Sequence, residues 1–171
     1  GDSMANVLYG LENTHKITLN DVIKHTLSVK KSIKKSLLVV DMPKGSYSNY
    51  KKAKKNAKLI IKSTGCDAVK LESNNHNYKI IEKLVIKNIP VMGHIGYTPQ
   101  FKKKFKIEGD TPEKAKKLLK KALNYYAVPV VRQLLIAMLL VKNNTGKIIK
   151  NFATRKKRKL SYLHPQLMLK R

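Results

Sequence analysis

Three carboxylates stand beside short apolar runs or turns of the chain, where their spacing could support metal chemistry. Asp41 directly follows the apolar run at residues 36–40, Glu72 follows residues 66–71, and Asp2 stands in a Gly-Asp-Ser turn. An all-oxygen set of carboxylates suits hard cations such as Mg²⁺, so the three predict a divalent-metal site. On spacing alone, each acid also fits a simpler interpretation as a helix N-cap or a surface residue.

The segments that must position these acids alternate between helix and strand. Apolar residues recur at helical spacing in three segments, residues 17–35, 50–64 and 78–87. Continuous apolar runs typical of buried parallel strands fall at residues 36–40, 66–71 and 89–92. Thr18 or Asn20 could cap the first helix, Gly65 could end the second, and another helix is predicted over residues 110–126. The alternation predicts βα units, whose functional groups gather at the carboxyl ends of the strands.

Two further side chains could join the acids at the strand ends. Lys70 precedes Glu72 by two residues and therefore shares its face of the strand, where it would point inward; on an exposed strand it would be solvated. His94 follows Gly93 at the third strand end, and the glycines around it allow close approach of a ligand. A lone histidine is more often structural, so both interpretations stay open. His25 falls within a predicted helix and receives no role.

The net charge of +27 would suit a polyanion partner, but its distribution argues against one. Of the 37 basic residues only four are Arg, and the lysines are spread along the chain. Lys and Asn are both abundant, a bias that AT-rich coding would produce without selection for binding. Lysine lacks the bidentate fork with which Arg reads bases. The basic cluster at residues 155–159 is interpreted as part of a solvated or disordered tail. Nucleic-acid binding is therefore the less favoured interpretation.

The single cysteine and the apolar pattern bear on the setting of the protein. Cys66 has no cysteine partner within the chain, which excludes an internal disulfide and fits a reducing, cytoplasmic environment. No apolar run approaches the roughly 20 residues of a membrane span, and the first residues lack the features of a signal peptide. We therefore expect a cytoplasmic protein with no membrane partner.

Several stretches of the chain resemble the ketopantoate hydroxymethyltransferase family in order and spacing, over residues 1 to about 126. The matching residues are Gly1-Asp2-Ser3, Val7-Leu8-Tyr9-Gly10, Thr18-Leu19, His25-Thr26, Asp41-Met42-Pro43, Gly45-Ser46-Tyr47, Asp67-Ala68-Val69-Lys70-Leu71-Glu72, Pro90-Val91-Met92-Gly93-His94-Ile95-Gly96 and Thr98-Pro99-Gln100. The resemblance implies an α/β fold of the (β/α)8 TIM-barrel type. It also implies transfer of a hydroxymethyl group from 5,10-methylenetetrahydrofolate to 3-methyl-2-oxobutanoate, giving ketopantoate for pantothenate biosynthesis.

The same resemblance implies roles for individual residues. Asp2 and Asp41 match the family's Mg²⁺ ligands, with Glu72 in support. The substrate-binding set that it implies is Asp2, Ser3, Asp41, Lys70 and His94. In this set the Ser3 hydroxyl would hold the substrate carboxylate; taken alone, Ser3 would be an ordinary turn serine. The family also forms large homo-oligomeric rings, so further copies of the chain are expected partners beside the 2-oxo acid and the folate.

The chain departs from the family pattern at both ends. The family's proton-abstracting glutamate belongs to a Leu-Glu-Cys-Val-Pro type of stretch, but the segment after Tyr126 is AVPVVRQLLIAMLLV, and no Asp or Glu follows Glu113. No general base is therefore identified. The family's opening barrel units also have no counterpart before Asp2. We therefore expect an incomplete barrel over residues 1–126 and a divergent, apolar then basic tail over residues 127–171.

These departures leave alternatives to an active transferase. A reading-frame change near codon 126 would explain the loss of acids, and translation of the encoding DNA in the other frames would test it. A basic fragment that binds nucleic acid or another polyanion without catalysis is a second hypothesis. A third is another barrel enzyme, an aldolase or lyase, that uses metal-enolate chemistry on a 2-oxo acid.

Overall fold

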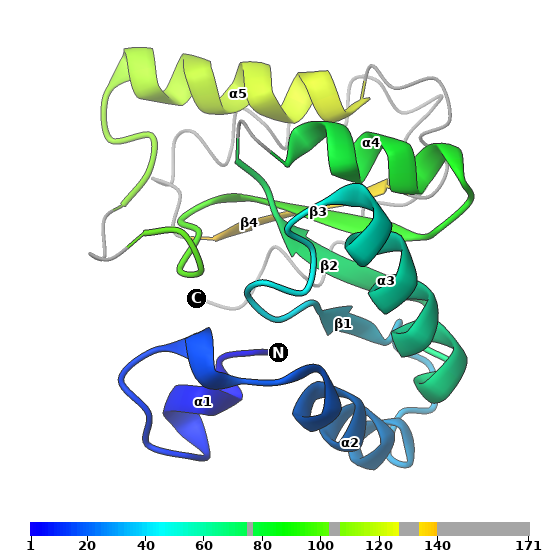
Figure 1. Ribbon diagram of the computed structural model, residues 1–171. Coiled ribbons are helices and arrows are strands. Elements are labelled where there is room, and N and C mark those ends of the chain that lie inside the picture. Colours follow the sequence, from blue (N-terminus) through cyan, green and yellow to red (C-terminus); the bar gives the residue numbers. More distant parts are fainter. Residues whose placement is uncertain (75–76, 103–106, 127–133, 140–171) are drawn as a thin grey trace.

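The computed structural model of the 171-residue chain describes residues 1–74, 77–102, 107–126 and 134–139, and the basic cluster at 155–159 lies outside these residues. Helices and strands alternate along it (Figure 1). The helical elements are α1 (Met4–Val7), the 3-10 helix η1 (Thr14–Lys16), α2 (Leu19–Lys30), α3 (Tyr50–Thr64), α4 (Tyr78–Ile86) and α5 (Pro112–Tyr126). The strands are β1 (Val39–Asp41), β2 (Ala68–Glu72), β3 (Val91–Gly96) and β4 (Leu134–Leu139).

The four strands form one parallel sheet in the order β1-β2-β3-β4. The α/β class, the parallel sheet and the βα alternation expected from the sequence are confirmed, and the order is compatible with successive units of a TIM barrel. No element was predicted at β4, which lies within residues 127–171 and pairs with β3. His94, expected at a strand end, lies inside β3, which continues to Gly96.

Local signals in the sequence explain where the helices begin. The Thr18 hydroxyl accepts a hydrogen bond from the Asp21 N–H, and the Asp21 carboxylate accepts from the Thr18 N–H, which completes a capping box at the start of α2. At α3, the Asn49 side chain accepts from the Lys52 N–H at 2.9 Å. Of the two residues considered as the cap of the first long helix, Thr18 is therefore the one that caps it.

The predicted end of the second long helix at Gly65 is confirmed. Gly65 has a φ of 60°, in the left-handed region, and its N–H donates to the Ile61 carbonyl at 2.8 Å. A Cβ at this position would also lie 2.2 Å from Nζ of Lys30, whose ammonium donates to the Thr64 carbonyl at the end of α3. The left-handed conformation favours glycine, whereas the ammonium at the end of the flexible Lys30 side chain can shift.

A Gly65→Ala substitution is expected to lower the free energy of unfolding by about 1 kcal/mol, because an L-residue pays a steric cost in the left-handed region. Urea unfolding followed by circular dichroism measures the change. Ser63→Ala, at an exposed position in the same helix, is the control and should change stability by less than about 0.5 kcal/mol. Equal stability of Gly65→Ala and the native chain would contradict this account of the helix end.

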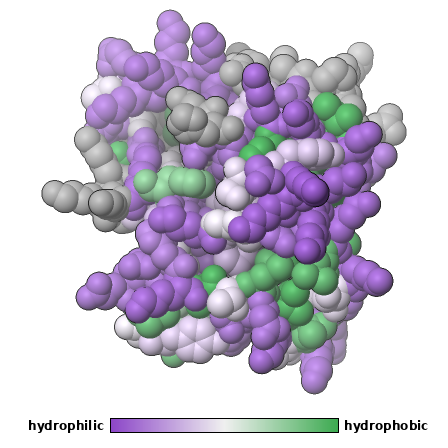
Figure 2. Space-filling model, viewed as in Figure 1, coloured by the Kyte–Doolittle hydropathy of each residue, from purple (hydrophilic) through white to green (hydrophobic). Residues whose placement is uncertain are grey.

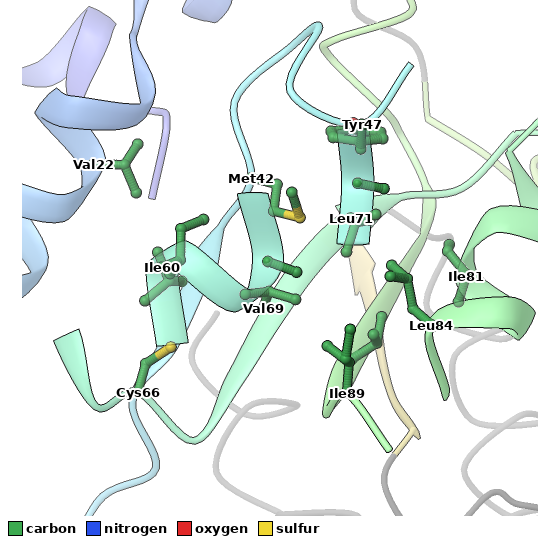
Figure 3. Close-up of a cluster of buried hydrophobic side chains, with 14 of the residues drawn as sticks. Val22, Met42, Tyr47, Ile60, Cys66, Val69, Leu71, Ile81, Leu84 and Ile89 are labelled. Atoms are coloured by element: carbon green, nitrogen blue, oxygen red, sulfur yellow. The ribbon is translucent and has the colours of Figure 1, made fainter. Parts of the chain in front are cut away.

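The hydrophobic core lies between the sheet and the helices that follow its strands. Figure 3 shows the buried side chains gathered there, among them Val69 and Leu71 of β2 with Ile60 of α3 and Leu84 of α4. All four are fully buried. Alternate residues of β2 thus pack against the helices, which leaves Lys70 and Glu72 for the opposite face of the sheet.

The outside of the molecule reflects the excess of lysine. Figure 2 shows a face on which hydrophilic residues predominate, with a smaller hydrophobic area in the part of the view where α2 and α3 lie. Leu27, Val29 and Leu59 of these helices are among the exposed large apolar residues. Within the described residues, no helix has both the length and the apolar character needed to cross a membrane.

Candidate active site

One face of the sheet carries most of the polar residues singled out in the sequence. Asp41 lies beside Lys70 in the β1–β2 register, and Glu72 lies beside His94 in the β2–β3 register. Neighbouring residues of parallel strands point to the same face, as do residues two apart in one strand. The four side chains therefore share the face opposite the helix-packed core. Asp41, Glu72 and His94 are buried, and Lys70 is half-buried.

Asp2 reaches the same place from the turn before α1. Its N–H donates to Oδ2 of Asp41 at 3.2 Å, which sets the turn directly against the end of β1. A Cβ at Gly1 would lie 2.4 Å from the same oxygen, so this close approach requires glycine in the Gly-Asp-Ser motif. Burial, and then the charge of Asp41, raise the pKa of the Asp2 carboxyl above its usual value. Ser3 is exposed beside this turn and begins α1 without a side-chain cap bond.

Lys70 supplies a positive charge beside these two acids. Its Nζ lies 2.7 Å from Oδ1 of Asp41, so both carboxylate oxygens of Asp41 have partners. The inward direction expected for Lys70 is therefore the one it takes. The ion pair offsets part of the repulsion between Asp2 and Asp41 within a buried site.

Glu72 and His94 form the second part of the site. Nδ1 of His94 lies 3.9 Å from Oε1 of Glu72. Burial raises the pKa of Glu72 to about 8 and lowers that of His94 to about 4, so both groups are neutral between these values and the contact is no ion pair at neutral pH. Neither ring nitrogen of His94 has a hydrogen-bond partner among the described residues. A buried imidazole without partners can accept or donate a hydrogen bond to a ligand.

Gln100 joins the two parts, and no role was predicted for it. Its Nε2 donates to Oδ2 of Asp2 at 2.7 Å, and its N–H donates to Oε2 of Glu72 at 2.9 Å. Its Oε1 accepts from the hydroxyl of Tyr47 at 2.5 Å. Burial raises the pKa of Tyr47 far above its usual value, so this hydroxyl stays protonated. The Thr-Pro-Gln stretch was part of the family resemblance and was the available signal for this residue.

The donor set suits a hard cation at Asp2 and Asp41. These carboxylates are adjacent and buried, and oxygen ligands are the ones that Mg²⁺ prefers. In the described part of the chain, no three His, Cys, Asp or Glu side chains are grouped closely enough to hold a metal without other ligands. Glu72 lies at the far side of Gln100, where it can support the site.

Comparison with known proteins agrees with the motifs at this site. A family model described as ketopantoate hydroxymethyltransferase matches residues 1–152. The chain belongs to this family. The match continues past residue 126, the limit of the resemblance found in the sequence motifs, and includes β4.

Individual relatives support the assignment to the ketopantoate hydroxymethyltransferase family. A 3-methyl-2-oxobutanoate hydroxymethyltransferase of Pelagibacter ubique is 50% identical over 109 residues, covering 64% of this chain and 42% of the relative. Proteins of the same name from Clostridioides difficile and Pyrococcus furiosus are 44% and 40% identical over 126 residues, covering 71% of this chain and 46% and 44% of themselves. The chain thus spans less than half the length of these three relatives.

Proposed function

We propose that this chain binds a divalent cation together with 3-methyl-2-oxobutanoate, the substrate side of the 3-methyl-2-oxobutanoate hydroxymethyltransferase reaction. The observation that carries the proposal is the buried pair Asp2 and Asp41, joined by the 3.2 Å hydrogen bond and placed at the sheet edge beside Lys70, Glu72 and His94. Membership in the family supplies the reaction, and the residues at this edge supply the chemistry that it needs.

Asp2 and Asp41 would hold the cation, with Glu72 in support. Held there, Mg²⁺ would supply Lewis acidity, which would stabilise negative charge on the 2-oxo oxygen as the neighbouring carbon loses its proton. The protein groups around it bind and orient the substrate. Their burial excludes water, which strengthens each electrostatic contact.

Three other side chains have roles toward the 2-oxo acid. Lys70 carries the positive charge that balances the substrate's carboxylate, and it stands 2.7 Å from Asp41. Ser3, exposed beside Asp2, offers its hydroxyl and N–H to the same carboxylate. His94 is buried and has two ring nitrogens free of partners among the described residues, so it can hydrogen-bond to the substrate or the co-substrate.

The remaining features of the proposal come from the family. The co-substrate would be 5,10-methylenetetrahydrofolate, the metal Mg²⁺ or a similar divalent cation, and further copies of the chain would be partners. The parallel order β1-β2-β3-β4 supports a TIM-barrel arrangement. The relatives are named as transferases, and they lend no support to the polyanion-binding alternative. A cytoplasmic setting remains a prediction.

Full turnover needs a base, and the sequence has no acid after Glu113 to take that role. The proposed activity is therefore substrate binding with slow activation of the C3 proton, to which water or buffer can serve as base. Complete hydroxymethyl transfer requires the family's base glutamate, and this chain has no Asp or Glu in the stretch where the family carries it. A more basic solution is then expected to speed the proton loss.

Exchange of the C3 proton of 3-methyl-2-oxobutanoate for deuterium tests the proposal. In D₂O with Mg²⁺, the native chain is expected to exchange the proton at least about tenfold faster than buffer with Mg²⁺ alone, since positioned metal and Lys70 stabilise the enolate. Proton NMR follows the loss of the C3 signal. EDTA should abolish the acceleration, and Asp41→Ala should remove it while Asp110→Asn, which changes a surface pair with Lys114, should not. Acceleration that survives Asp41→Ala would remove Asp41 from the metal site.

A further inference from the structure

We propose that Gln100 is a positioning residue of the cation site, and that Tyr47 fixes the orientation of its amide. Gln100 contacts the carboxylates of Asp2 and Glu72, and it lies beyond the end of β3. The inference rests on the proposed function, since it concerns how the proposed cation ligands are held.

The side-chain amide of Gln100 and its backbone N–H are all engaged in this structure. Nε2 donates to Oδ2 of Asp2 at 2.7 Å and to the Met42 carbonyl at 3.0 Å, and the backbone N–H donates to Oε2 of Glu72 at 2.9 Å. Only 3% of Gln100 is exposed, so water does not compete for these bonds. A buried polar network in which each member is satisfied is rigid, and it fixes the positions of the groups that it joins.

The amide must face one way for this arrangement to work. The Tyr47 hydroxyl donates to Oε1 of Gln100 at 2.5 Å, which places the NH₂ group toward Asp2. If the amide turned over, Oε1 would face the Asp2 carboxylate and the Met42 carbonyl, which are both acceptors, and Tyr47 would lose the acceptor of its hydroxyl proton. Tyr47 is 2% exposed and packs edge-on against the ring of Phe101, so its hydroxyl position is itself fixed by the core.

The contacts select particular carboxylate oxygens. Gln100 takes Oδ2 of Asp2 and Oε2 of Glu72, which leaves Oδ1 of Asp2 as the oxygen to turn toward a cation and Oε1 of Glu72 toward His94. Partners that orient metal ligands in this way typically contribute 10- to 100-fold to metal affinity. Gln100 therefore sets the geometry of the cation site through Asp2 and Glu72 without touching the cation.

Binding of Mn²⁺ to the full chain tests the proposal, with free Mn²⁺ measured by electron paramagnetic resonance. Gln100→Met keeps the side-chain volume but removes the amide, and its dissociation constant is expected to rise about tenfold or more. Tyr47→Phe keeps the ring but frees the amide to turn, and a rise of about three- to tenfold is expected. Asn56→Leu removes a half-buried side-chain amide that donates to the Ser46 carbonyl at 2.7 Å and contacts none of the carboxylates, and it should change the constant less than about twofold.

The variants separate positioning from general stability. A purely structural role would lower the thermal midpoints of Gln100→Met, Tyr47→Phe and Asn56→Leu alike and leave Mn²⁺ affinity unchanged in all three, a result that overturns the proposal. If Gln100→Met does not fold, Tyr47→Phe decides, and native Mn²⁺ affinity in that variant overturns it. Absence of Mn²⁺ binding by the native chain would instead refute the proposed cation site, and this inference with it.

Discussion

An Asp41→Asn substitution is expected to weaken Mn²⁺ binding by more than about 100-fold, at or beyond the upper end of what supporting residues of metal sites contribute. Asparagine keeps the shape of the side chain but removes its charge and one of its two acceptor oxygens. Asp41 is the residue where the contacts of the site converge, because it pairs with Lys70 at 2.7 Å and accepts from the Asp2 N–H at 3.2 Å.

The substitution also leaves Lys70 without its carboxylate, so the protein fold must be followed in parallel. Titration of Mn²⁺ at matched protein concentrations gives the affinity, and thermal unfolding by circular dichroism gives the stability. Asp110→Asn removes one exposed carboxylate that pairs with Lys114, and it should bind Mn²⁺ like the native chain. A folded Asp41→Asn variant with native Mn²⁺ affinity would show that the cation lies elsewhere.

The contribution of Glu72 to the stability of the metal-free chain is expected to fall as the pH rises from about 5 to 8. Burial raises the pKa of this carboxyl to about 8 from an ordinary 4.5. Across that window the folded chain holds a proton that the unfolded chain has lost, so a rising pH favours unfolding. The contribution of the protonated carboxyl is complete below the ordinary value and is lost as the pH passes the folded value. The loss amounts to a few kcal/mol.

His94 acts in the opposite direction but in a lower range. Burial lowers its pKa to about 4 from 6.5, so the unfolded chain binds a proton more readily there, and stability rises with pH until about 6.5. Measurements at pH 6.5 and 8.5 therefore isolate Glu72 from His94. Between about pH 4.5 and 6.5 the two effects oppose each other and largely cancel, so the net decline caused by Glu72 is expected between about pH 6.5 and 8.

Glu72→Gln provides the test of this pH dependence. The glutamine retains an oxygen to accept from the Gln100 N–H but does not ionise. Urea unfolding in the presence of EDTA measures the free energy of unfolding at the two pH values. Its decline should be smaller for the variant than for the native chain, and the contributions of other titrating groups cancel in this comparison. Equal declines would contradict the raised pKa of Glu72.

Local patterns predicted most of the helices and strands because local physics sets their ends. The second long helix has its predicted bounds, since Asn49 caps its start and Gly65 takes the left-handed conformation at its end. The first is shorter than its apolar pattern suggested. It begins after Thr18, where the capping box forms, and it ends at Lys30. The apolar spacing continues through residues 31–35, but spacing alone does not show where the packing of the helix stops.

The site was predictable only in part, because its contacts join residues far apart in the chain. The alternation of strands and helices placed Asp41, Glu72 and Lys70 at one edge, and the two-residue spacing put Lys70 on the face of Glu72. Gln100 bonds to Asp2 across 98 positions, and such a contact leaves no periodic signal. The strand β4 was also missed, since an apolar stretch that is interrupted by Pro129 fits a strand, a helix or a loop equally well.

Cooperative binding of metal and 2-oxo acid tests the central claim most directly. Mn²⁺ is titrated into the native chain with and without saturating 3-methyl-2-oxobutanoate, and with 3-methylbutanoate, which lacks the oxo group, as the control ligand. The 2-oxo acid is expected to tighten Mn²⁺ binding at least about fivefold, because its oxo oxygen and a carboxylate oxygen would act as ligands beside Asp2 and Asp41. The control acid and the Asp41→Asn variant should show no such coupling. Mn²⁺ binding that is absent, or that the 2-oxo acid leaves unchanged, would contradict the account.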